Sequence, residues 1–143
     1  MFDRARSIAF LLGRVAIGAI FLVHGWTKFS SGLSGTAGFF ESVGIPLAGV
    51  AAPAVAVLEV VGGIALILGA ALPVFGTLLA LNMLGAILFV HGQAGFFADK
   101  GGYEFVLALA AASLMIAFSG GGALAVDSLW QGRRDRTGAT TSV

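Results

Sequence analysis

Residues 50–91 read VAAPAVAVLEVVGGIALILGAALPVFGTLLALNMLGAILFVH, and Glu59 is the only acidic or basic residue before the closing His91. Pro73 divides this run into two apolar segments. Each is close to the roughly 20 residues that an α-helix needs to cross about 30 Å of hydrocarbon. The connection between them is only a few residues long, so the two helices must be antiparallel neighbours. This stretch therefore predicts a helical hairpin inside a membrane.

Two further apolar segments flank the hairpin. We expect spanning helices over residues 8–29, 50–72, 74–91 and 103–119 and a polar tail over 131–143, all within a single membrane domain (residues 1–143). The first segment follows basic residues, as in a signal peptide, but it is too long for a signal-peptide core, contains Arg14 and lacks a small-residue cleavage site. The predicted fold class is all-α, an integral membrane four-helix bundle.

The composition supports this class and excludes others. Hydrophobic residues make up 58% of the chain and charged residues 10%, too few charges to cover a soluble domain of this size. The net charge is +1 and no stripe of Lys and Arg exists, which excludes a nucleic-acid-binding surface. There is no cysteine, which excludes a thiol–disulfide relay and a thiolate-bound iron–sulfur cluster.

Basic residues predict the orientation. Arg4 and Arg6 precede the first span and three more arginines follow the last, whereas each outer loop balances one lysine with one acidic residue. Because positive charge stays in the cytoplasm, we expect a multi-pass protein of the cell (inner) membrane with both termini cytoplasmic. Trp130 is expected to be an interfacial anchor.

The first outer loop is not featureless. Phe39, Phe40 and Val43 share one helical face, and Gly44 and Pro46 then supply stop signals. We therefore expect a short amphipathic helix over residues 36–43, lying on the outer surface. The alternative is an unstructured linker.

Two similar seven-residue segments indicate an internal repeat. Residues 19–25 read AIFLVHG and residues 86–92 read AILFVHG, and these segments contain both histidines of the chain. Residues 38–40 and 95–97 both read GFF, and Glu59 and Glu104 fall in the outer portions of the second and fourth spans. We interpret the bundle as two pseudo-repeated helical hairpins related by an axis along the membrane normal.

Ionisable residues within spanning segments are costly and usually face the interior of the protein. Here they form two groups. The outer group is a candidate ligand-binding cluster: His24, Lys28, Glu59, His91 and Glu104. The inner group, Arg14 with Asp127, is predicted to be a structural ion pair. The alternative for the outer cluster is that it, too, only holds the helices in register.

Three chemistries could use the outer cluster. A quinone headgroup can accept hydrogen bonds from a histidine and a lysine while Glu59 relays protons. Two histidines on different helices can ligate a haem iron, which we regard as the weaker alternative because both can equally face water at helix ends. A metal site is not predicted, because the Glu-x-x-His pairs of di-iron bundles are absent. Nothing in the sequence assigns a catalytic activity.

Short motifs follow one another in a fixed order between about residues 9 and 129. They are Arg14, Gly18, Phe21, His24-Gly25, Lys28, Gly44, Pro46, Glu59-x-x-Gly62-Gly63, Leu68-Gly69, His91, Tyr103-Glu104, Ser119-Gly120-x-Gly122 and Asp127. In order and spacing this pattern resembles the DoxX family. Gly121 departs from it, since the family usually has a proline there.

The resemblance implies a four-helix inner-membrane protein. Relatives of this type include subunits of a thiosulfate:quinone oxidoreductase and proteins associated with oxidative-stress enzymes. We therefore expect an accessory or quinone-linked subunit of a membrane redox system, in contact with the lipid bilayer and with soluble or membrane redox proteins. A small transporter, a ligand-binding membrane protein or a scaffold for soluble partners is the alternative, and a homo-oligomer is compatible with each.

Overall fold

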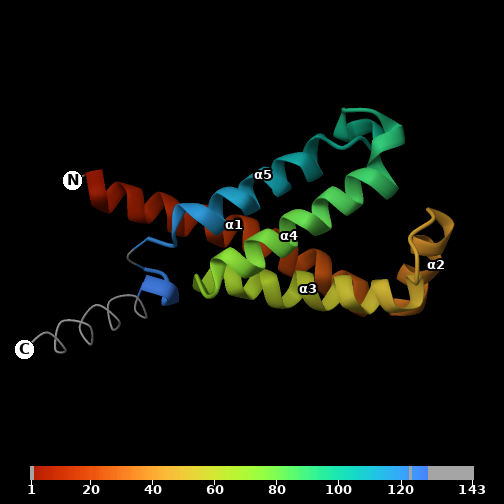
Figure 1. Ribbon diagram of the computed structural model, residues 1–143, viewed down its shortest axis with the longest axis horizontal. Helices are drawn as coiled ribbons and strands as arrows, with labels where there is room; N and C mark the ends of the chain where they lie inside the picture. The colour runs from red at the N-terminus through yellow and green to blue at the C-terminus, as the bar shows by residue number, and fades with distance from the viewer. Residues whose placement is uncertain (1, 123, 129–143) are drawn as a thin grey trace, which may run out of the picture.

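The computed structural model describes residues 2–122 and 124–128, and every element within these ranges is a helix. The α-helices are α1 (Phe2–Ser30), α2 (Leu33–Ser42), α3 (Ala48–Leu68), α4 (Leu72–Ala86) and α5 (Glu104–Ser119), as Figure 1 shows. Between α4 and α5 lie a π-helical turn, η1 (Ile87–His91), and two 3-10 turns, η2 (Gly92–Ala94) and η3 (Ala98–Lys100). The expected Trp130 anchor and the tail over 131–143 lie outside the described residues.

Three helical stretches are long and apolar enough to cross a membrane. They are Phe2–Ser30, Ala48–Leu68 and the continuous run Leu72–Ala94. α5 is also apolar but has 16 residues, about 24 Å of helix. Large apolar side chains project outward from these helices, among them Leu12, Val15, Val57, Val61, Leu78, Leu114 and Met115. The chain is therefore a membrane protein whose apolar surface contacts lipid.

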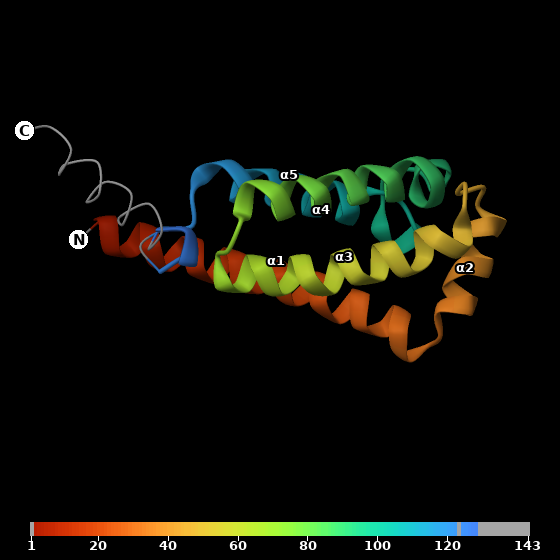
Figure 2. The same ribbon diagram turned by 60° about the horizontal axis from the view of Figure 1, so that its bottom comes forward.

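The helices pack as two pairs. α1 lies against α3 and α4 lies against α5, and Figure 2 shows the two pairs as separate layers. Glycines allow the close approach within each pair. A Cβ on Gly18 would lie 2.6 Å from the carbonyl oxygen of Gly63, and a Cβ on Gly76 would lie 2.7 Å from the carbonyl oxygen of Ser113. Backbones this close leave no room for a side chain.

α1 extends beyond the apolar run from which it was predicted. It begins at Phe2, six residues before the expected start. Arg4 and Arg6 are good helix formers and continue the helix beyond the apolar segment. With 29 residues the helix is about 43 Å long, which exceeds the thickness of the hydrocarbon layer.

The turn between α3 and α4 also differs from expectation. α3 ends at Leu68, four residues earlier than predicted, because Gly69 adopts φ +73° and terminates the helix. Three hydrogen bonds close this end: Gly69 N–H donates to the oxygens of Ala65 and Leu66, and the next N–H also donates to the oxygen of Ala65. Pro73 lies within the first turn of α4, not between the helices, since a proline costs little there.

The short helix expected over residues 36–43 is present as α2, which begins at Leu33. It packs against α3 and buries Phe40, while Phe39 remains 48% exposed. α2 lies at the same end of the molecule as η1–η3, and the α3–α4 turn and residues 124–128 lie at the opposite end (Figures 1 and 2). We call these the α2 end and the turn end.

The helix that contains α4 changes its hydrogen-bond register before it ends. Residues Ile87–His91 are π-helical, whereas the matching segment 19–25 is an ordinary part of α1. The two similar seven-residue segments thus differ in backbone conformation. Single π-helical turns redirect the side chains that follow them and are frequent at functional sites.

Candidate ligand-binding site

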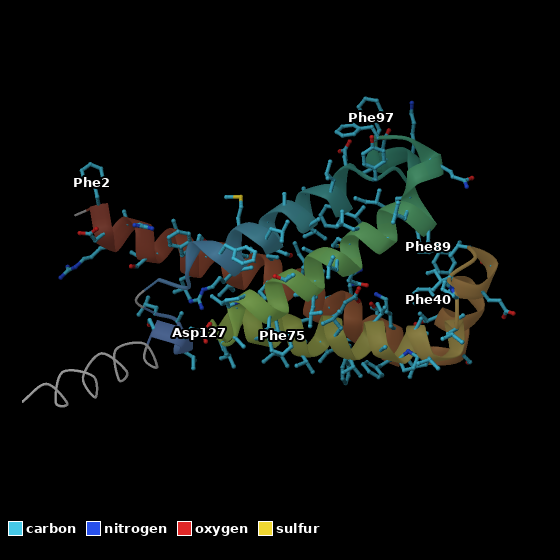
Figure 3. The ribbon with its side chains drawn as sticks, in the orientation of Figure 1. Phe2, Phe40, Phe75, Phe89, Phe97 and Asp127 are labelled. Carbon is cyan, nitrogen blue, oxygen red and sulfur yellow. The ribbon has the colours of Figure 1, made fainter. Side chains whose placement is uncertain are left out.

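A cavity of about 600 Å³ lies between the helices toward the α2 end. Its wall is mainly aliphatic and aromatic and draws on every α-helix, with Phe21, Phe39, Phe40, Phe89, Phe105 and Leu109 among its residues. Figure 3 shows Phe40 and Phe89 near one another at this end, from α2 and from η1. A mostly apolar cavity of several hundred Å³ with a few polar groups is the usual form of a small-molecule site.

Glu59 is the buried acid of the cavity wall, with 4% of its surface exposed. Lys28 forms a salt bridge from Nζ to Oε2, and Asn82 donates from Nδ2 to Oε1 at 3.0 Å. No other salt bridge forms among residues 2–122 and 124–128. Both carboxylate oxygens therefore have a donor, which a buried carboxylate requires.

Glycine on α1 allows this contact to form. A Cβ on Gly25 would lie 2.8 Å from Cβ of Glu59 and 2.8 Å from the backbone nitrogen of Val60. Lys28 follows three residues later on the same face of α1, so its ammonium reaches Glu59 on α3. Asn82 approaches the same carboxylate from α4. The site thus joins the α1–α3 pair to the α4–α5 pair.

Glu59 lies near the midpoint of α3, not in its outer portion as expected from the sequence. It follows Ala48, the start of α3, by eleven residues, and Asn82 follows Leu72, the start of α4, by ten. At 1.5 Å per residue these separations are about 16 and 15 Å. Each is about half the thickness of a hydrocarbon layer, so the hydrogen bond between Glu59 and Asn82 joins the two helices near their centres.

Both histidines line the cavity. His91 Nδ1 lies 2.7 Å from the carbonyl oxygen of Gly101. Because a carbonyl can only accept, Nδ1 carries the proton, and Nε2 of the neutral ring has a free lone pair. His24 has an exposed side chain, and its carbonyl oxygen accepts from Lys28 Nζ at 3.4 Å. Among the described residues, no three His, Cys, Asp or Glu side chains gather to hold a metal ion.

Glu104 lies outside the cavity wall. It is the first residue of α5, and its N–H donates to the carbonyl oxygen of Phe96 at 2.9 Å. The structure thus brings together four of the five predicted residues and adds Asn82, which the sequence reasoning left out. A signal for Asn82 was present, because it is the only amide side chain in residues 74–91.

Asp127 lies at the turn end (Figure 3), and Arg14 binds the same part of the chain, but each has different hydrogen-bond partners. Arg14 is 1% exposed and donates from Nη2 to the oxygen of Leu124 at 3.3 Å. The carboxylate of Asp127 accepts from the N–H groups of Ala71 at 2.8 Å and Leu72 at 2.9 Å. The predicted ion pair is not a salt bridge within the described residues, where the two side chains make three hydrogen bonds to backbone, one from Arg14 and two to Asp127. Asp127 caps the first turn of α4.

The fold and the cavity together define a small helical membrane protein with a ligand-sized apolar cavity and a buried ion pair in its wall. The chain belongs to the DoxX family, whose model matches residues 9–92. This match confirms the resemblance seen in the order of the motifs.

Three relatives each cover most of the chain. It is 38% identical over 125 residues to "Putative oxidoreductase CatD" of Bacillus subtilis (strain 168), which is 87% of this chain and 89% of that protein. It is 29% identical over 131 residues to "Inner membrane protein YphA" of Escherichia coli (strain K12), 88% of this chain and 93% of that protein. It is 35% identical over 128 residues to an "Uncharacterized protein" of Haemophilus influenzae (strain ATCC 51907 / DSM 11121 / KW20 / Rd), which is 87% of this chain and 91% of that protein. No solved structure matches the chain significantly.

Proposed function

We propose that this chain is a quinone-binding accessory subunit of a membrane redox system, and that the cavity beside Glu59 receives the quinone ring. The observation that carries the proposal is a mainly apolar cavity of about 600 Å³ with a fully hydrogen-bonded ion pair in its wall. The apolar wall suits a ring with a hydrocarbon tail, and the few polar groups suit its oxygens.

The polar groups of the wall fit the oxygens of this ligand class. Quinone oxygens accept hydrogen bonds, and the hydroxyls of the reduced ring also donate them. Lys28 and Asn82 carry N–H groups, and Asn82 and His91 also carry acceptors. These side chains lie on α1, α4 and η1, all in the cavity wall. A ring between the helix pairs therefore has a polar partner within the wall in either redox form.

The catalytic step is assigned to a partner protein. The chain has no cysteine, so it offers no thiol and no thiolate-bound cluster to pass electrons to a bound quinone. One relative carries an oxidoreductase name, and the family resemblance extends to subunits of a thiosulfate:quinone oxidoreductase. We infer that this chain holds the quinone within the membrane while a soluble or membrane partner supplies the electrons.

Purified protein in detergent tests the proposal. We expect its lipid extract to contain quinone in near-stoichiometric amount, and a decyl-substituted benzoquinone to bind saturably. Gly85 lines the cavity, and a Cβ there meets no atom within 4 Å. Gly85→Phe should therefore fill the cavity and abolish binding without a backbone clash.

The matched control is Gly13→Phe. A Cβ on Gly13 also meets no atom within 4 Å, and this residue is exposed on α1 away from the cavity. Its quinone binding should equal that of the wild type. Absence of quinone and of saturable binding in the wild type, or unchanged binding in Gly85→Phe, would count against the proposal.

We further propose that α5 is a fourth crossing, which makes the protein a bundle of two pseudo-repeated hairpins with both termini cytoplasmic. The pairing of α1 with α3 and of α4 with α5 supports this arrangement. The cavity wall also contains one histidine from each predicted hairpin, which supports the same arrangement.

A further inference from the structure

Asn82 commits one N–H group of its amide to Glu59, and its carbonyl oxygen has no hydrogen-bond partner among the residues that the structure describes. We propose that the cavity prefers the reduced, hydroxyl-bearing form of a quinone over the oxidised form, and that Asn82 makes this discrimination. The inference rests on the proposed function, because it concerns the ligand of the same site.

The orientation of the Asn82 amide is fixed by its neighbour. A charged carboxylate can only accept, so Asn82 directs its NH₂ group to Oε1 of Glu59, at 3.0 Å. The carbonyl oxygen of the amide then points elsewhere, and among residues 2–122 and 124–128 it has no hydrogen-bond partner. Asn82 lines the cavity and is partly exposed to it. The cavity wall therefore offers an unpaired acceptor near the centre of the run Leu72–Ala94.

Lys28 is the strongest donor in the wall, but it is already engaged. Its ammonium forms the salt bridge with Glu59 and contacts the carbonyl oxygen of His24 at 3.4 Å. A quinone carbonyl that drew Lys28 away would leave the buried carboxylate with Asn82 as its only donor. An undercompensated buried charge is costly, so only the third N–H of the ammonium is free for a ligand, and it serves a carbonyl and a hydroxyl oxygen alike.

His91 offers a second acceptor, but at a different depth. Its Nδ1 donates to Gly101, which leaves Nε2 as the acceptor. His91 follows Asn82 by nine residues, about 13 Å along the helix, farther than the two oxygens of one ring are apart. The ring oxygen near Glu59 therefore meets Asn82, not His91. An acceptor left unpaired in the apolar centre costs more than one near the end of the helix.

A ligand hydroxyl can donate to the Asn82 oxygen and a carbonyl cannot. The second N–H of the amide does not discriminate, because a hydroxyl oxygen and a carbonyl oxygen both accept from it. When a site is built to bond a ligand hydroxyl, an analogue without that hydroxyl leaves a buried group unpaired and binds more weakly. The diphenol form of the ligand should therefore bind at least about tenfold more tightly than the quinone form, the effect of one net hydrogen bond.

A ligand series on the wild-type protein tests this without any substitution. Three decyl-substituted compounds share the same ring and tail: the benzoquinone, its hydroquinone kept reduced under anaerobic conditions, and the dimethyl ether of that hydroquinone. The ether keeps the reduced ring and both oxygens but has no O–H. Titration calorimetry in detergent should give the hydroquinone the lowest Kd, with the quinone and the ether weaker by about tenfold or more.

Asn82→Leu should bring the affinities for the three compounds together, whereas His91→Gln should leave their ratio unchanged. If the ether or the quinone binds the wild type as tightly as the hydroquinone, the inference is overturned and the proposed function stands. If none of the three binds saturably, the proposed function fails and this inference fails with it. Because the ligand series uses only wild-type protein, the result does not depend on whether Asn82→Leu folds.

Discussion

Glu59 holds its charge between the helices because two other helices supply donors. Lys28 from α1 neutralises it, and Asn82 from α4 bonds the oxygen that Lys28 leaves free. Gly25 makes the contact possible by letting α1 approach α3. The carboxylate thus ties both helix pairs together, and its loss should disturb more than one interface.

Glu59→Ala should destabilise the protein by about 3–5 kcal/mol, because Lys28 is left without its counter-charge. Thermal unfolding in detergent measures this loss. The control is Glu41→Ala, at an exposed position on α2, which should change the free energy of unfolding by at most about 0.5 kcal/mol. Equal losses in the two variants would show that the Lys28–Glu59 pair contributes nothing to stability.

Sequence reasoning at the residue scale identified most of the cavity's polar residues but missed the bond between Asn82 and Glu59. Gly25 and Lys28 are three residues apart and share one face of α1, and both lie against α3. Spacing within one helix carries no information on the axial register between helices. Glu104 was therefore grouped with residues that it does not reach, and Asn82 was left out although it bonds Glu59 directly.

At the scale of elements, the ends of helices at the turn end are held by groups from distant parts of the chain. Gly69 terminates α3, and a Cβ there would lie 1.6 Å from Nη1 of Arg14. Asp127 accepts from the first N–H groups of α4, and its own N–H donates to the oxygen of Gly69 at 3.0 Å. Residues beyond α5 thus close the turn between α3 and α4, where the backbone groups of both helix ends need partners.

Asp127→Ala should destabilise the protein by about 1–2 kcal/mol, because the first turn of α4 loses both acceptors of its cap. Asp127→Asn keeps one oxygen and should lose roughly half as much. Thermal unfolding in detergent measures both. The control is Asp99→Ala in η3, an exposed residue, which should leave the melting temperature unchanged. An Asp127→Ala protein as stable as wild type would exclude the capping role.

The helices themselves were predictable and their ends less so. Long apolar runs predict spanning helices because hydrocarbon leaves the backbone no other partners. Hydropathy does not report where a helix continues into polar sequence, which is why the start of α1 at Phe2 was missed. Nor does it report hydrogen-bond register, so the π-helical turn Ile87–His91 had no sequence signal.

At the scale of the whole molecule, the two helix pairs are joined differently at their two ends. At the turn end, Arg14 and Asp127 connect α1, the α3–α4 turn and the residues after α5. Toward the α2 end the pairs are separated by the cavity, whose wall includes side chains of α2. A ligand between the pairs would therefore add contacts where the cavity separates them.

The connections of α5 make a fourth crossing the expected topology. At its start, Tyr103 and Glu104 donate to the oxygens of Gly95 and Phe96, just beyond the run Leu72–Ala94. After its end, Asp127 accepts from the N–H groups of Ala71, just before α4, and Leu72, the first residue of α4. If that run crosses the membrane, the chain from Glu104 to Asp127 must return across it, even though the 16 residues of α5 span only about 24 Å. The tilt and local thinning of a bilayer accommodate such a difference.

Reporter fusions test this topology. With both ends in the cytoplasm, where the terminal arginines favour them, alkaline phosphatase fused after Gly35 or after Lys100 should be active. Green fluorescent protein fused to the C-terminus should be fluorescent, and alkaline phosphatase there inactive. A phosphatase that is active at the C-terminus would mean an odd number of crossings. That result would require α5 to lie along the membrane surface, a position incompatible with the bonds of Asp127 to the α3–α4 turn.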